Sequence, residues 1–167
     1  MAITKIQSES MNLADTYAFT GTVTGAGETN TPAFYARASS NQTFTDATFN
    51  KVVVDTEDLD TDNAFASSRF TVPSGKGGLY TLSAQVRSNT QNDGSEYNMA
   101  FFLNGSIITR GASKLMVGGS TGMYHVNTTI VDLDAGDYVE AYFYPDASSN
   151  TTSESGYVFF AGYKITQ

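Results

Sequence analysis

The chain has 167 residues, no cysteine and a net charge of −8. This length suits one domain with a well-filled core. The lack of cysteine excludes disulfides and thiolate metal sites. The acidic excess disfavours nucleic acid as a partner, because such binding depends on cations that neutralise phosphates. No segment approaches the roughly 20 consecutive apolar residues that span a bilayer, so the sequence predicts no membrane insertion.

From about Ala33 onward, apolar and polar residues alternate in short runs, a period of two that is typical of strands with one face on a core. The clearest run, residues 79–88, has an apolar face of Tyr80, Leu82, Ala84 and Val86. Later runs repeat the pattern with Tyr97, Met99, Phe101 and Leu103, then Tyr124, Val126, Thr128 and Ile130, then Tyr157, Phe159, Ala161, Tyr163 and Ile165.

Turn residues separate these runs. Asn104 and Gly105 supply the two positive φ angles of a tight hairpin, and residues 135–137 mark a corner between strands. No window of a dozen residues carries a helical apolar stripe. The sequence therefore predicts an all-β sandwich or barrel of roughly eight to ten strands with scarce helix.

Five landmarks occur in one order along about four-fifths of the chain. They are Phe49-Asn50-Lys51-Val52-Val53, Phe70-Thr71-Val72-Pro73 with Gly78-Leu79-Tyr80-Thr81-Leu82-Ser83, Leu103-Asn104-Gly105, Leu133-Asp134-Ala135-Gly136-Asp137-Tyr138-Val139, and Phe160-Ala161-Gly162-Tyr163-Lys164-Ile165. In this order they resemble the C1q/TNF-like jelly-roll domain, here spanning residues 31–167. The turn at residues 74–77 is about two residues longer than that family's usual turn.

The resemblance implies a ten-stranded, two-sheet sandwich that assembles as a homotrimer through aromatic and apolar residues of one sheet. The pattern of residues 138–144 supports this assembly in part. Both faces of the run carry bulky groups, and only one face can pack on the core, so the other needs a cover. A neighbouring subunit and the N-terminal arm are both possible covers. The candidate trimer-interface residues are Tyr138, Tyr142, Tyr144, Tyr157, Phe159 and Tyr163.

Residues 1–30 differ from the rest and predict an extended arm followed by a flexible linker at residues 25–30. The opening resembles the leaders of structural proteins from marine tailed phages, which implies a docking arm. The apolar residues expected to dock are Ile3, Ile6, Leu13, Tyr17, Phe19 and Val23.

These resemblances favour a phage virion structural protein without enzymatic activity, made in the host cytoplasm and incorporated into the virion. It would act as a capsid decoration, head fibre or tail-associated protein that docks on other virion proteins and projects a trimeric jelly roll. The alternative is a receptor-binding tip, in which polar loops at residues 91–97 and 145–155 contact a host-surface glycan.

Few residues carry a pattern for chemistry. Asp58, Asp60 and Asp62 offer oxygen ligands that suit calcium, but the spacing of an EF-hand loop fails, and a solvated acidic turn is the favoured interpretation. No other cofactor is expected. The single histidine, His125, is expected at the surface or at an interface, on the polar face of a strand with Asn127 and Thr129.

Two further groups are interpreted as turns. Asp132, Asp134 and Asp137 are close enough in sequence for a pair of glycosidase carboxylates, but two of them fall in a predicted corner. Residues 74–78 are glycine-rich and contain Lys76, but they lack the spacing of a phosphate-binding loop.

Overall fold

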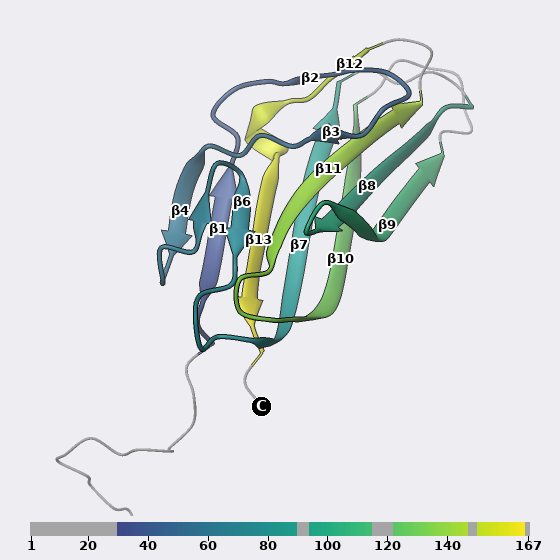
Figure 1. Cartoon of the computed structure of the whole chain (residues 1–167). Coiled ribbons are helices and arrows are strands. Elements are labelled where there is room, and N and C mark those ends of the chain that lie inside the picture. Colours follow the sequence, from purple (N-terminus) through teal and green to yellow (C-terminus); the bar gives the residue numbers. More distant parts are fainter. Residues whose placement is uncertain (1–29, 90–93, 115–121, 147–149, 166–167) are drawn as a thin grey trace, which may run out of the picture.

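The computed structural model describes residues 30–89, 94–114, 122–146 and 150–165. The predicted docking arm lies outside these residues. Figure 1 shows two antiparallel sheets that lie face to face. Among the described residues there are thirteen strands and one short 3-10 helix, η2 (Ser155–Tyr157), so the predicted all-β sandwich is confirmed. No helix in the described part of the chain is long and apolar enough to cross a membrane.

The first sheet has five strands in the order β10-β7-β13-β1-β4. Their bounds are β10 (Met123–Leu133), β7 (Gly78–Ser88), β13 (Phe159–Lys164), β1 (Ala33–Arg37) and β4 (Thr56–Asp60). β7 and β13 lie at the centre of this sheet, and β10 and β4 form its edges.

The second sheet has six strands: β5-β6-β11-β8-β9 in order, with β3 also paired to β11. Their bounds are β5 (Phe65–Ala66), β6 (Arg69–Thr71), β11 (Tyr138–Asp146), β8 (Glu96–Leu103), β9 (Ser106–Lys114) and β3 (Asn50–Lys51). A small third sheet pairs β12 (Thr151–Thr152) with β2 (Thr43–Phe44) across one end of the sandwich (Figure 1). The strand total exceeds the prediction because several of these strands are only two residues long.

The core lies between the two sheets and is rich in aromatic rings. The predicted inner face of β7 is confirmed, because Tyr80, Leu82, Ala84 and Val86 are all completely buried. Phe34 of β1 stacks on Phe70 of β6 with ring centroids 4.7 Å apart, so its ring joins the two sheets. Offset stacks of this kind add to the free energy gained from burying the rings themselves.

The predicted hairpin and corner are both confirmed. Asn104 and Gly105 connect β8 to β9 with φ angles of 49° and 81°. The Asn104 side chain also reaches the corner before β11, where its Nδ2 donates to Asp137 Oδ1 at 2.7 Å. The other oxygen of Asp137 accepts the backbone N–H of Asp134 at 2.9 Å. The Asp137 carboxylate thus closes a turn, in agreement with the structural interpretation of this acidic group.

The prediction of a surface position for His125 is wrong. This residue is 2% exposed, and Asn127 beside it on the same face is 7% exposed. The reason is the register with β7, which places His125 opposite Val86 and Asn127 opposite Ala84. Because cross-strand partners share a face, the polar side of β10 points into the core and its apolar side points outward.

The glycine-rich segment at residues 74–78 is a turn, as predicted. Gly75 has a φ of 74°, and the backbone N–H of Lys76 donates to Pro73 at 3.1 Å. The Tyr80 hydroxyl donates to the carbonyl of Lys76 at 2.6 Å, which fixes the turn to the start of β7.

Candidate interaction surface

The outer face of the five-stranded sheet carries most of the large apolar side chains that are exposed. Ile130, the most exposed of them at 64%, lies in β10 with Tyr124 and Val126. Large apolar side chains exposed on one face of a sheet are typical of an interaction site. We call this surface the apolar face; it consists of Tyr35, Leu59, Tyr124, Val126, Ile130, Tyr157 and Tyr163.

Strand register gathers these residues from distant parts of the sequence. Tyr35 of β1 lies between Ala161 of β13 and Leu59 of β4. Its ring also stacks on Phe159 with centroids 5.7 Å apart. The apolar face therefore extends across several strands of the sheet.

Two polar groups of β7 on the same surface already have partners within the chain. In β7, the Ser83 hydroxyl lies 3.1 Å from the Thr128 hydroxyl. Gln85 Nε2 donates to the carbonyl of Tyr157 at 3.0 Å. These groups would keep their hydrogen bonds within the chain if a partner covered them, so covering them would cost little free energy.

One end of the apolar face holds a fixed cation. The Arg87 guanidinium lies 5.7 Å from the ring centroid of Tyr124 and 5.3 Å from that of Tyr157. These two rings meet edge to face, and Arg87 also forms an ion pair with Glu154. The aromatic residues here are thus held in place by their own chain.

The structure does not bring the six predicted interface residues together. Tyr163 and Tyr157 belong to the apolar face, and Phe159 lies half-buried within it. Tyr138, Tyr142 and Tyr144 lie on the outer face of the opposite sheet, on β11. The sequence prediction missed Tyr35, Leu59, Tyr124, Val126 and Ile130 as members of this surface. In β10 the sequence did show the alternation of apolar and polar residues. The prediction assigned the apolar side to the core, whereas the structure places it outward.

The aromatic residues of β11 are partly covered by their own chain. The Arg69 guanidinium lies 4.0 Å from the ring centroid of Tyr138. Phe102 packs on Tyr142 with centroids 4.1 Å apart. The cover that residues 138–144 require is therefore supplied in part by neighbouring strands.

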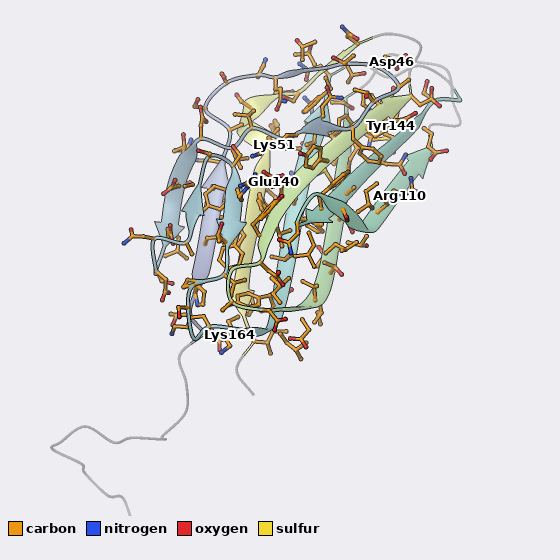
Figure 2. All side chains as sticks on the ribbon, in the orientation of Figure 1. Asp46, Lys51, Arg110, Glu140, Tyr144 and Lys164 are labelled. Atoms are coloured by element: carbon orange, nitrogen blue, oxygen red, sulfur yellow. The ribbon has the colours of Figure 1, made fainter. Side chains whose placement is uncertain are left out.

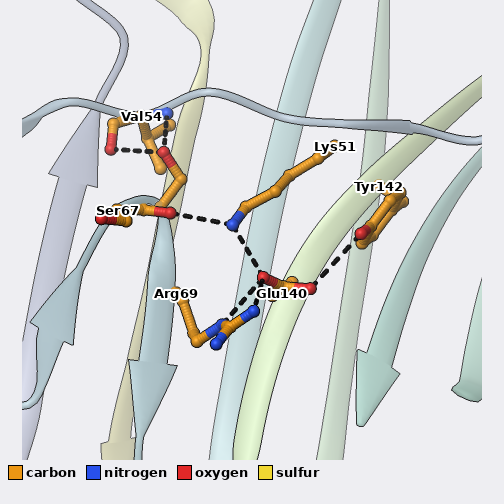
Figure 3. Close-up of polar contacts among 7 residues, drawn as sticks. Lys51, Val54, Ser67, Arg69, Glu140 and Tyr142 are labelled. Atoms are coloured by element: carbon orange, nitrogen blue, oxygen red, sulfur yellow. Dashed lines mark hydrogen bonds and ion pairs between the residues drawn. The ribbon is translucent and has the colours of Figure 1, made fainter. Parts of the chain in front are cut away.

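A buried carboxylate organises the same sheet. Glu140 is 4% exposed, and its Oε1 accepts from Lys51 Nζ at 2.7 Å and from Arg69 Nε at 2.8 Å (Figure 3). Its Oε2 accepts from the Tyr142 hydroxyl at 3.3 Å. Burial acts to raise the pKa of Glu140, but the hydrogen bonds and charges of Lys51 and Arg69 outweigh it and lower that pKa. The group is an internal ion-pair network that joins β3, β6 and β11.

Two of the three candidate calcium ligands have separate partners. Asp58 Oδ2 pairs with Arg37 Nε at 2.8 Å. Asp60 accepts the backbone N–H groups of Ala64 and Phe65, each at 2.9 Å, and so closes the turn after β4. The described residues contain no group of three or more His, Cys, Asp or Glu placed to hold a metal. Calcium binding by Asp58, Asp60 and Asp62 stays a prediction that a calcium titration would test.

No protein-family model matches this sequence, and no curated protein matches it. Solved structures do match. A crystal structure of murine APRIL at pH 5.0 is 12% identical, with a TM-score of 0.58 over 80% of this chain and 98% of that one. The globular domain of zebrafish complement 1qA is 16% identical, with a TM-score of 0.56 over 80% of this chain and 97% of that one.

The structure of Eiger, a TNF from S. frugiperda, is 10% identical, with a TM-score of 0.56 over 80% of this chain and 91% of that one. Identities this low carry information about the fold alone. The fold implied by the sequence landmarks and the fold of these structures agree. The described part of the chain is a C1q/TNF-like jelly roll.

Proposed function

We propose that this chain forms a homotrimer through its apolar face and serves as a non-enzymatic structural module of a phage virion. The apolar face is the observation that carries the assembly. Ile130, Val126 and Tyr124 are 64%, 50% and 48% exposed in the isolated chain, while the polar side of their strand is buried. A strand with its apolar side outward favours a protein partner over solvent. A symmetric oligomer covers such a surface with copies of itself.

The virion role rests on the resemblance of the leader and on the separation of the two ends of the sandwich. The first described residues lie beside Lys164, whose backbone N–H donates to Pro32 at 2.9 Å. Figure 2 places Lys164 at one end of the sandwich and Tyr144 toward the other. An arm of residues 1–30 docked on capsid or tail would thus leave the far end projecting. Three linked arms raise the avidity of docking well above that of one arm.

Light scattering on the full chain is the first test. A solution mass of three chains supports the proposal, and a monomer at micromolar concentration overturns the assembly. The virion role needs a second measurement, namely incorporation of the protein into particles. Deletion of residues 1–24 is expected to abolish incorporation, and unchanged incorporation would rule out docking through the arm.

A second function, contact with a host-surface glycan, is favoured by a cavity on the six-stranded sheet. This cavity lies where β8 begins and β11 ends, and its lining residues Glu96 and Asp146 belong to the stretches 91–97 and 145–155 that were predicted to contact a glycan. Binding of the intact protein to host cells tests this function. An absence of binding across susceptible hosts would argue against it.

A further inference from the structure

We propose that a cavity on the outer face of the six-stranded sheet binds a single uncharged sugar ring. The cavity has a volume of about 180 Å³. Register explains its composition, because Tyr144 lies opposite Asn98 and Asp146 lies opposite Glu96 on the paired strands β11 and β8. Figure 2 labels Tyr144 and, on β9, Arg110. The lining residues are Phe49, Glu96, Asn98, Arg110, Tyr144 and Asp146.

Two aromatic rings form the apolar part of this sugar cavity. Phe49 and Tyr144 have ring centroids 5.0 Å apart and planes inclined by 49°. Phe49 is in turn supported by Phe102, with centroids 5.4 Å apart. The electron-rich face of an aromatic ring attracts weakly positive C–H groups, and one face of a pyranose presents such groups. The cavity therefore offers a preformed surface for the apolar side of a sugar.

A buried amide supplies the second, independent observation. Asn98 is only 6% exposed, and its Nδ2 donates to Glu96 Oε1 at 3.0 Å. Within the described residues, the carbonyl oxygen of the Asn98 side chain accepts no hydrogen bond. Buried polar atoms are nearly always paired, so this acceptor requires a donor from outside the described chain. A sugar hydroxyl is a donor of the right kind.

Two of the three charged residues of the cavity are not used to stabilise the fold. Arg110 and Asp146 form no ion pair and no side-chain hydrogen bond with any described residue. Glu96 and Asp146 are direct cross-strand partners, an arrangement in which like charges destabilise a sheet. Planar groups that donate and accept in fixed directions suit the hydroxyls of a sugar.

The net negative charge of the residues that line the cavity favours an uncharged ligand over an acidic one. Two carboxylates face one guanidinium, so the cavity disfavours acidic sugars such as uronic acids. The positive charge of Arg110 also disfavours a metal ion between Glu96 and Asp146. The volume is below the roughly 300–1,000 Å³ of sites that enclose larger ligands, which limits the occupant to one ring. Affinity for one ring is expected on the order of 1 mM, and several linked copies would raise it.

This inference deepens the glycan-binding function and does not depend on the homotrimer. The test is saturation-transfer NMR on the full chain with five probes: the methyl glycosides of glucose, galactose, mannose, N-acetylglucosamine and glucuronic acid. Saturable transfer is expected to at least one of the four neutral probes and not to the glucuronide. Transfer to none of the neutral probes, or to the glucuronide alone, overturns the inference.

Two variants and a control locate the binding. Tyr144→Ala is expected to reduce transfer at least fivefold by removing the aromatic surface. Asp146→Asn keeps the shape of an exposed side chain and is expected to weaken binding at least twofold. Val53→Ala, at an exposed position between β3 and β4 that belongs neither to the cavity nor to the apolar face, is expected to leave transfer unchanged. Unchanged transfer in both cavity variants, with circular dichroism showing folded protein, overturns the location.

The same samples separate this inference from the functions proposed above. Light scattering reports whether the protein is a trimer, and the NMR signal reports whether the cavity binds a sugar. A monomer that binds a neutral sugar overturns the assembly and supports the cavity. Sugar binding without attachment to host cells supports the cavity and removes the host-receptor function.

Discussion

Tyr124 and His125 are adjacent in β10 and point to opposite faces of the five-stranded sheet, and the histidine is the buried one. Tyr124 is 48% exposed, whereas His125 is 2% exposed. The His125 ring lies 4.9 Å from the rings of Tyr97 and Phe143, and its Nε2 is 2.9 Å from the Ser88 hydroxyl. Because this strand buries its histidine and exposes its tyrosine, its outer side is apolar and favours contact with a partner.

The buried histidine makes stability depend on pH. Burial lowers the pKa of His125 from 6.5 to about 4, so the folded protein keeps this ring neutral while the unfolded chain protonates it. Stability is therefore complete above pH 6.5 and is lost as the pH falls from 6.5 toward 4. Titration of His125 is expected to lower the free energy of unfolding by about 2 kcal/mol when the pH falls from 7 to 5.

Urea unfolding at pH 7 and pH 5 measures this effect. His125→Gln cannot titrate in this range, so its loss of stability should be smaller than that of the natural protein by about 2 kcal/mol. The carboxylates contribute equally to both proteins and cancel in the comparison. Equal losses in the two proteins would show that His125 is not the group responsible.

Assembly is expected to fail when a charge is placed on the apolar face. Ile130→Glu introduces a carboxylate at a position that is 64% exposed in the isolated chain, so the monomer should fold normally. The trimer should dissociate, because burying an unpaired carboxylate at an interface costs several kcal/mol. Light scattering measures the mass of the variant.

Val53→Glu is the matched control for this variant. Val53 is 46% exposed and lies outside the apolar face, between β3 and β4. This control should keep the oligomeric state of the natural protein. A trimer in Ile130→Glu would mean that the apolar face is not the interface.

Glu140 is expected to stabilise the protein only while it is ionised. Glu140→Gln keeps the shape of the side chain but removes the charge that Lys51 and Arg69 bind. The expected loss is about 1–2 kcal/mol at pH 7, because both cations are partly exposed and solvent screens them. Since the pKa of Glu140 is lowered in the folded state, its contribution is present above the ordinary pKa of 4.5 and disappears as the pH falls below it.

Chemical unfolding of Glu140→Gln at pH 7 and pH 3 tests this dependence. The difference from the natural protein should shrink at pH 3, because the unfolded chain binds a proton at this carboxyl below pH 4.5 and the contribution of Glu140 to stability falls there. Glu57→Gln, at an exposed position in β4, should change stability by less than about 0.5 kcal/mol at either pH. A constant difference for Glu140→Gln across pH would assign its effect to packing.

Gly162 is expected to tolerate no side chain. A Cβ at this position of β13 would lie 2.7 Å from Leu82 Cδ2 and 2.8 Å from the carbonyl oxygen of Thr81. Both lie in the neighbouring central strand β7, where the backbone cannot move away. Gly162→Ala should lower the free energy of unfolding by about 1–3 kcal/mol.

Gly156→Ala serves as the comparison in the same unfolding assay. A Cβ at Gly156 would meet nothing within 4 Å. This variant should therefore be close to neutral. Similar losses for the two variants would show that close contact in β13 is not the cause.

The sequence by itself determined the strands and turns, because their signals are local. The alternation in residues 79–88 corresponds to β7, and Asn104 with Gly105 forms the hairpin after β8. The order of landmarks also identified the jelly roll. Each strand, turn and landmark is a short stretch of neighbouring residues, and the order of the landmarks is read along the chain, so no knowledge of neighbouring strands was needed.

Only the tertiary structure decided which face of β10 meets the core. In β10 the sequence predicted that the polar side faces outward, and the pairing of His125 with Val86 shows the opposite orientation. The cavity at Asn98 likewise depends on Asp146 and Phe49, which lie far from Asn98 in the sequence. Alternation within one strand does not show which of its sides faces the core. That choice depends on the pairing of the strand with its neighbours, which is a property of the whole sheet.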